Sequence, residues 1–176
     1  TDFEFDKVYV EGIRALTPID ISYAAELGYR IKHLGILRSS PDGIEARVHP
    51  TLVPHSELMA HVNGVLNAVQ VVSDAAGKTL FSGPGAGGAA TASAVVADIV
   101  ETALNPQQPI ADRNSSAAMT VRPIEDISSA YYLRIPTRDE PGVFAEVTQI
   151  LSSHNINIDA VIQKDSHPQG GSVDIV

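Results

Sequence analysis

Cysteine and tryptophan are both absent from this chain of 176 residues, and aromatic residues make up only 5% of it. Without cysteine, the chain offers no disulfide, no thiolate nucleophile and no zinc–cysteine site. Because aromatic residues are scarce, any core must be packed mainly from aliphatic side chains. The hydrophobic content of 44% is ordinary for a globular protein and suffices for one core or two small ones.

Basic residues are also scarce. Lysine and arginine together number 12 against 21 acidic residues, which gives a net charge of −9. Nucleic acids and anionic membranes both bind clustered basic side chains, so the charge balance argues against either partner. The six histidines show no spacing, relative to a carboxylate on the same predicted helix, that would predict a metal site.

No segment has the pattern of a signal peptide or of a membrane span. The first six residues contain neither a basic nor an apolar region. The most apolar predicted helix, residues 89–104, is too short to cross a bilayer and carries Asp98 and Glu101. We therefore expect a cytoplasmic protein. Because the chain starts without methionine and stops inside the strand-like residues 172–176, we also expect it to be part of a longer protein.

Residues 1–104 have the pattern of an α+β domain. Five segments read as strands: residues 7–13, 29–38, 44–53, 65–73 and 78–81. The turn signal Ser39-Ser40-Pro41-Asp42-Gly43 predicts an antiparallel hairpin between the second and third of them. Together these segments predict an open, mainly antiparallel sheet with helices on one face.

Two helices are predicted in the same region. Thr17-Pro18-Ile19-Asp20 combines a hydroxyl cap, a proline in the first turn and an acid three residues after the cap, and Gly28 is a natural terminator. The second helix covers residues 89–104. Its apolar residues recur on one side, and we expect that side to be buried. These residues are Val95, Val96, Ile99, Val100, Ala103 and Leu104.

The rest of the chain separates into a linker and a second unit. Residues 105–128, with their prolines and the run Asn114-Ser115-Ser116, have the composition of an interdomain linker. Residues 129–176 form a smaller unit with alternating strand and helix patterns, cut off as a third strand begins. The predicted segments are strand 131–135, turn 139–142, a helix from 143 that ends at His154-Asn155, and strand 156–162.

A glycine-rich run, Phe81 to Gly88, leads into the second helix. Gly83, Gly85 and Gly88 formally fit G-x-G-x-x-G, but no strand and acidic residue follow as a dinucleotide fingerprint requires. No Lys-Ser or Lys-Thr pair follows either, so a phosphate-binding P-loop is excluded. Two interpretations stay open: a turn where a strand and a helix pack closely, and a loop that contacts a cofactor outside a Rossmann fold.

Several segments of residues 1–104 resemble, in one collinear order, the later part of the catalytic domain of homoserine dehydrogenase. The segments that carry the resemblance are Val8–Ile13, Asp20–Ile21, Ala25–Lys32, His49–Pro54, Val62–Val69 and Phe81–Val95. The second unit is similar to an ACT domain, a ferredoxin-like βαββαβ fold that binds amino acids, here truncated. That similarity rests on Tyr132–Ile135, Asp139–Phe144 and Asn155–Ile158. Catalytic part, linker and ACT unit occur in this order in homoserine dehydrogenases.

The resemblance implies an NAD(P)-dependent enzyme that interconverts L-homoserine and L-aspartate 4-semialdehyde by hydride transfer. It also implies an ACT tail for amino-acid feedback, with L-threonine as the suggested effector, and a homo-oligomer built through the sheet of residues 29–81. In the family, the Rossmann domain and the catalytic aspartate and lysine precede the segment matching Val8–Ile13. We therefore assign no catalytic residue, do not substitute Lys32 for one, and expect this piece to be inactive. The alternative is a non-enzymatic, amino-acid-sensing regulatory module.

The resemblance also implies site residues. The third glycine of the Gly-x-Gly-x-Gly run, Gly87, would contact the dinucleotide, NADP or NAD, with Gly85 and Thr91 as weaker candidates. Thr91 could instead cap the helix. In the ACT unit, an amino-acid effector would lie at the turn and helix start, with an asparagine of an opposite copy completing the site. In the alternative interpretation the same residues are a turn glycine and a left-handed cap. These effector residues are Asp139, Gly142, Val143 and Asn155.

Overall fold

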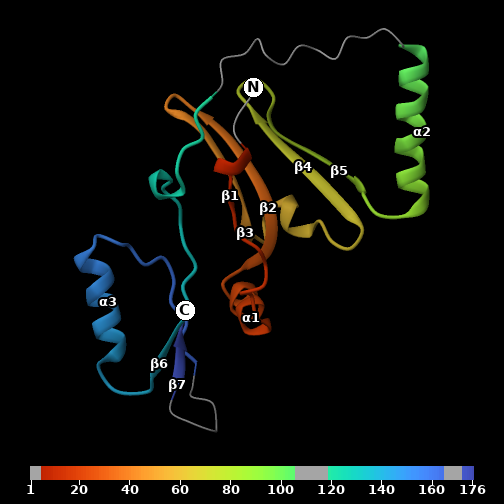
Figure 1. The fold of residues 1–176 in the computed structure, drawn as a ribbon. Helices are drawn as coiled ribbons and strands as arrows, with labels where there is room; N and C mark the ends of the chain where they lie inside the picture. The colour runs from red at the N-terminus through yellow and green to blue at the C-terminus, as the bar shows by residue number, and fades with distance from the viewer. Residues whose placement is uncertain (1–4, 106–118, 165–171) are drawn as a thin grey trace.

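The computed structural model describes residues 5–105, 119–164 and 172–176 (Figure 1). The strands are β1 Tyr9–Val10, β2 Tyr29–Ser40, β3 Gly43–Pro54, β4 Leu66–Ser73, β5 Gly77–Pro84, β6 Ile135–Arg138 and β7 Ser172–Ile175. The α-helices are α1 Pro18–Glu26, α2 Gly88–Leu104 and α3 Val143–Ser153. Short 3₁₀ turns are η1 Phe5–Lys7, η2 Leu58–His61 and η4 Ile124–Asp126.

The longest pairing is the β2–β3 hairpin. It is antiparallel from Tyr29 opposite Pro54 to Ser40 opposite Gly43, which confirms the predicted hairpin. The strand expected at residues 7–13 is reduced to β1, which pairs in parallel with β3. Ile44 and Ala46 of β3 pack with Val121 into a buried cluster. This sheet therefore depends on a contact with a segment far along the chain.

β4 and β5 form a second antiparallel hairpin with its own sheet. The mixed fold with antiparallel sheets is confirmed, but the strands of the first hundred residues form two sheets rather than one open sheet. The expectation of a buried face on the helix that follows is wrong. No residue of α2 is buried, and Val96 and Ile99 are more than half exposed. The apolar spacing of α2 is present, but no described segment covers it.

Helix α1 starts and stops as predicted. The backbone N–H of Thr17 donates to the Asp20 carboxylate at 2.8 Å, and the Thr17 hydroxyl donates to the same oxygen. Gly28 has a φ of 84°, the left-handed conformation expected of a terminator. The Asp20 carboxylate also accepts from Arg134 Nε at 2.7 Å and from the Tyr132 hydroxyl at 3.0 Å. A helix cap thus also serves as a link between the two halves of the chain.

The C-terminal unit is smaller than the pattern suggested. The strand expected at 131–135 begins only at Ile135, because Ile135 lies opposite Ile175 at the end of β7. The strand expected at 156–162 does not form. Only Ile162 and Gln163 reach β7: Ile162 exchanges two backbone hydrogen bonds with Val176, at 2.7 and 2.9 Å, and Gln163 bridges Ile175. Backbone groups before Ile162 have no strand beside them in the described part of the chain.

The predicted linker lies partly outside the described residues, at 106–118. Its described end packs against the first sheet. The Arg122 N–H donates to the Ile44 carbonyl at 2.8 Å, and the Arg122 guanidinium lies 3.5 Å from Glu45. Gly43 has a φ of 133°, and a Cβ there would lie 2.4 Å from the Thr120 carbonyl oxygen. Only glycine fits this crossing of the hairpin and the returning segment.

The Asp20 carboxylate gives a prediction of pH dependence. Burial alone would raise the pKa of Asp20, but hydrogen bonds from Thr17, Arg134 and Tyr132 outweigh it and lower the pKa from 3.8 to about 2. A lowered pKa means that the stabilisation is present above the unfolded value near 4 and is lost as the pH falls towards 2. The loss should amount to about 2 kcal/mol. Urea unfolding of the chain between pH 2 and 7 measures it. Asp20→Asn should flatten this part of the profile, and an unchanged profile would contradict the assignment.

Gly43 gives a prediction of stability with a matched control. Gly77 also has a positive φ, of 66°, but a Cβ there would meet nothing within 4 Å. Gly77→Ala should therefore cost only backbone strain, about 1–2 kcal/mol. Gly43→Ala should cost clearly more, because the new methyl group must also displace the Thr120 carbonyl. Chemical denaturation of both variants measures the difference, and equal losses would show that the close approach at Gly43 is not a packing constraint.

Candidate functional site

The glycine loop joins β5 to α2. Gly87 is the N-cap of α2, with a φ of 119° and a ψ of 144°, a conformation that residues with side chains rarely adopt. A Cβ at Gly87 would meet nothing within 4 Å. The backbone therefore requires glycine at 87, and the space beside it is open. The first N–H groups of α2 have no partner within the helix, so this end favours an anion.

Gly85 instead lies against the exposed side chain of Asn67. A Cβ at Gly85 would lie 1.4 Å from the Asn67 side-chain nitrogen. The Gly85 N–H donates to the Val65 carbonyl at 2.9 Å, and the Ser82 hydroxyl donates to the Asn67 carbonyl at 3.1 Å. These contacts fix the start of the loop on β4. The interpretation as a close-packed turn therefore suits Gly85, whereas Gly87 has room for a ligand.

Thr91 does not cap the helix. The cap position is Gly87, and no side chain provides a capping hydrogen bond there. The Thr91 N–H donates to the Gly87 carbonyl at 3.0 Å, and its side chain is exposed on the first turn of α2. The formal G-x-G-x-x-G match has no Rossmann context either, because the loop follows an antiparallel hairpin rather than a parallel β-α-β unit.

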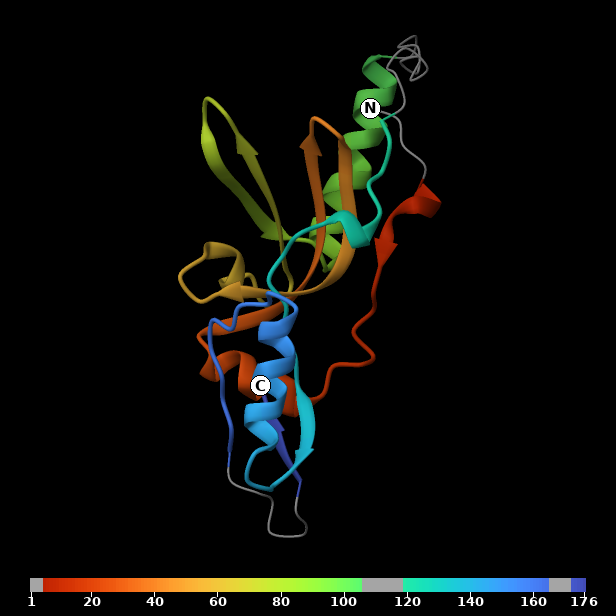
Figure 2. The same ribbon diagram turned by 90° about the vertical axis from the view of Figure 1, so that its left-hand side faces the viewer.

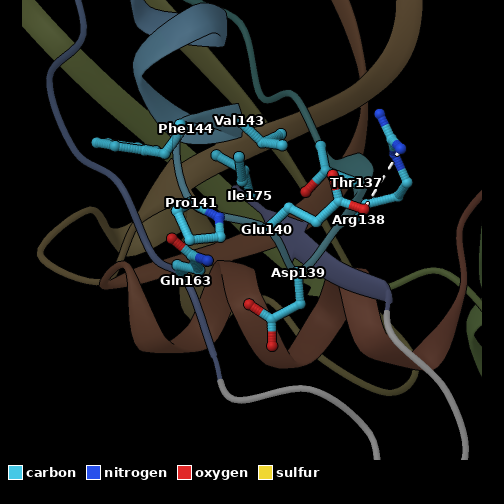
Figure 3. A pocket seen from close by; sticks show the side chains of 10 residues that line it. Thr137, Arg138, Asp139, Glu140, Pro141, Val143, Phe144, Gln163 and Ile175 are labelled. Carbon is cyan, nitrogen blue, oxygen red and sulfur yellow. Dashed lines mark hydrogen bonds and ion pairs between the residues drawn. The ribbon is translucent and has the colours of Figure 1, made fainter.

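A pocket of about 330 Å³ opens at the turn before α3 (Figure 3). Figure 3 shows Val143, Phe144 and Ile175 gathered on one side and the Asp139 carboxylate on the other. The pocket therefore offers an apolar wall, acidic groups and the N-terminus of an α-helix, which together suit a small zwitterion. Its lining residues are Thr137, Arg138, Asp139, Glu140, Pro141, Gly142, Val143, Phe144, Gln163 and Ile175.

Three of the four predicted effector residues lie at this pocket. Asp139, Gly142 and Val143 line it, and Gly142 has a φ of 96°. Asn155 does not line it: it follows His154, the C-cap of α3, and has a φ of 57°, the left-handed conformation. The predicted contact of Asn155 with an effector bound by a second copy of the chain stays a prediction. Sequence reasoning missed Gln163, and only its place beside β7 shows that it belongs to the site.

The Lys32 side chain is bound to the segment before β4 and does not face a catalytic acid or base in the described part of the chain. Its ammonium group donates to the Val62 carbonyl and, at 2.9 Å, to Asn63 Oδ1. Burial, and then the charge of Arg30, lower the pKa of Lys32. These contacts tie β2 to the segment before β4 and leave no described acid or base beside the ammonium group. Lys32 is therefore a structural tie.

The histidines and acidic residues of the described ranges do not form a metal site. No group of three or more His, Asp or Glu side chains there is arranged to hold a metal ion. His33 and His61 each bond to a backbone carbonyl, of Glu11 at 2.9 Å and of His55 at 2.8 Å. None of the helices described combines the length and the apolar character that a bilayer span requires.

Two family models match the chain. The model described as homoserine dehydrogenase matches residues 1–100, and the model described as ACT domain matches residues 131–176. The second match contains the whole pocket before α3, and the first contains the glycine loop.

The most similar curated relatives and solved structures that we compared are homoserine dehydrogenases as well. Homoserine dehydrogenases of Pseudomonas aeruginosa and Neisseria gonorrhoeae are 48% and 47% identical, with 98% and 93% of this chain covered. A crystal structure of a homoserine dehydrogenase from Thiobacillus denitrificans superposes with a TM-score of 0.80 at 46% identity, covering 98% of this chain and 40% of that one. The chain spans 42% and 40% of the two curated relatives. By sequence and by fold, this chain belongs to the homoserine dehydrogenase family and carries an ACT domain.

Proposed function

We propose that this chain is part of an NAD(P)-dependent homoserine dehydrogenase that interconverts L-homoserine and L-aspartate 4-semialdehyde in the cytoplasm. The observation that carries the proposal is the glycine loop, in which Gly87 alone combines a glycine-only backbone conformation with open space beside it. The family match over residues 1–100 supplies the context. Units 1–104 and 129–176, joined by the linker 105–128, would be the enzymatic and regulatory parts.

Gly87 is the proposed contact to the cofactor, which is NADP or NAD. When bound, the nicotinamide supplies the group that accepts or donates the hydride. The chain contributes a backbone that can approach it closely, and free N–H groups at the start of α2 that favour its negative charge. Gly85 keeps the loop on β4, and Thr91 lies one turn into the helix. We assign no proton-transfer residue within this chain.

The pocket before α3 is the proposed effector site, with L-threonine as the effector. The effector carboxylate would lie at the N-terminus of α3, beside Gly142 and Val143, and its ammonium group near Asp139. The apolar wall would cover the side chain. Asn155 of a second copy would complete the site in a homo-oligomer, built through the sheet of residues 29–81. A free-standing sensor without dehydrogenase activity is the alternative, and assay of the full-length protein separates the two.

The cofactor assignment predicts a selective kinetic defect. In the full-length enzyme, Gly87→Val should raise the KM for NADPH by about tenfold or more, because the side chain blocks close backbone approach and strains the loop. The KM for the semialdehyde should change less. Gly77→Val, also at a positive φ but outside the loop, is the matched control for strain. An unchanged KM for NADPH in Gly87→Val would sink the assignment.

The effector assignment predicts a change in ligand affinity. Asp139→Asn should weaken L-threonine binding about tenfold, because it removes the charge that holds the ligand's ammonium group. Asp159→Asn, which removes an exposed carboxylate outside the pocket, should leave the affinity unchanged. Isothermal titration of both variants measures the effect. Equal affinities in the two variants, or no binding by the unmodified enzyme, would reject L-threonine at this pocket.

A further inference from the structure

The small sheet of the ACT unit has two faces with different neighbours. In β6 and β7, Ile135 lies opposite Ile175, and Gln163 bridges Ile175 from the other side. Residues directly opposite each other share a face, and successive residues alternate between faces. Thr137, Gln163 and Ile175 therefore point to one face, and all three line the pocket. The residues next to these in sequence are therefore expected on the opposite face, except at the end of β6, where Arg138 also lines the pocket.

That opposite face carries three charged side chains, Arg134, Lys164 and Asp174. Each is next in sequence to a residue of the pocket face: Ile135, Gln163 and Ile175 respectively. Figures 1 and 2 show β6 and β7 beside α1, with α3 in the same unit. The charged face is thus the side of the ACT sheet that meets the first half of the chain.

The charged face contacts α1 through specific pairs. Arg134 Nε lies 2.7 Å from the Asp20 carboxylate, and its Nη1 lies 3.6 Å from Asp174, which joins β7 to the same network. Lys164 Nζ lies 2.6 Å from Glu26. The pair with Glu26 is half exposed and contributes little. Asp20, by contrast, is only 5% exposed, so its pair with Arg134 is the strong one.

Helix α1 connects this contact to the glycine loop region. It ends at Glu26, and after Gly28 the chain enters β2, where Lys32 donates to the Val62 carbonyl and to Asn63. That segment leads into β4, whose Asn67 packs against Gly85. A series of contacts and chain connections therefore runs from the ACT sheet to the proposed cofactor loop.

We propose that occupancy of the ACT pocket acts on the enzymatic part through this charged face, with the Arg134–Asp20 pair as the essential link. The inference rests on the proposed function of the pocket as an amino-acid site. A ligand seated on Thr137, Gln163 and Ile175 shifts the short strands that carry those residues. The neighbouring residues hold α1: Arg134, just before β6, and Lys164, just after Gln163, pair with it directly, and Asp174 of β7 pairs with Arg134. The ligand therefore favours one position of α1 over another. Arg134 and Asp20 are positioning residues and touch no reactant.

The test uses the full-length enzyme with L-threonine as the probe. Removing Arg134 alone would leave a buried carboxylate unpaired, so the main variant is the double substitution Asp20→Asn with Arg134→Gln, which neutralises both partners. L-threonine binding, measured by titration, should change by less than about twofold. The factor by which saturating L-threonine lowers kcat/KM should fall at least about fivefold. Lys78→Gln, which removes an exposed ion pair with Glu57, is the control and should retain full inhibition.

A second experiment, which needs no ligand, tests the coupling between the pocket and α1 separately from the binding of L-threonine. Thr137→Leu fills the pocket with a side chain, and hydrogen exchange of the α1 amides reports the response. The inference predicts changed exchange in α1 when the Arg134–Asp20 pair is intact, and no change in the double variant. If L-threonine does not bind, the effector proposal fails, but this comparison still decides the inference. Inhibition retained in the double variant, or an α1 response independent of the pair, would overturn it.

Discussion

The buried carboxylate of Asp20 is the interaction on which the arrangement of this chain depends. It closes the first turn of α1 by accepting from Thr17 at Oδ2, and its other oxygen, Oδ1, accepts from Tyr132 and Arg134 more than 110 positions later. A group 5% exposed must keep its charge satisfied, because an unpaired buried carboxylate is costly. The Tyr132 hydroxyl is affected by the same burial. Burial, and then its hydrogen bond to Asp20, raise the pKa of Tyr132. One side chain thereby sets both a helix start and the place of the C-terminal unit.

The features that the sequence predicted well are those decided by neighbouring residues. The cap at Thr17 and Asp20 and the β2–β3 turn need only local geometry. Failures arose where the deciding partner lies far away. The spacing of α2 indicates an apolar face but not whether anything covers it. Residues 156–161 alternate like a strand, but no strand in the described ranges pairs with them. The candidate effector site shows the same difference between near and distant partners. Its neighbouring residues Asp139, Gly142 and Val143 were predicted together from the sequence. Gln163 and Ile175 come from other segments and were not predicted.

The two inner glycines of the loop show why a motif does not assign roles by itself. Gly85 and Gly87 are two residues apart and equivalent in the pattern, yet a side chain would meet a different obstacle at each. At Gly85 the excluded volume is already occupied by Asn67, while at Gly87 the volume is empty and the backbone angle imposes the restriction. A position restricted by its backbone and open to solvent has room for a ligand. At Gly85 a rotation of the exposed Asn67 side chain would relieve the contact, whereas no neighbour can relieve the backbone angle at Gly87.

The return of residues 119–122 to the β2–β3 hairpin has a consequence for the order of folding. Ile44 and Ala46 can pair within the hairpin at once, but their cluster is completed by Val121, and Arg122 reaches Glu45 across 77 positions. Closing so long a loop costs entropy before the contact can repay it. During synthesis the hairpin therefore emerges with its apolar side uncovered and stays so until the segment at 119–122 has been made. The core of the first sheet is, in time, completed only after both hairpins and α2 have been made.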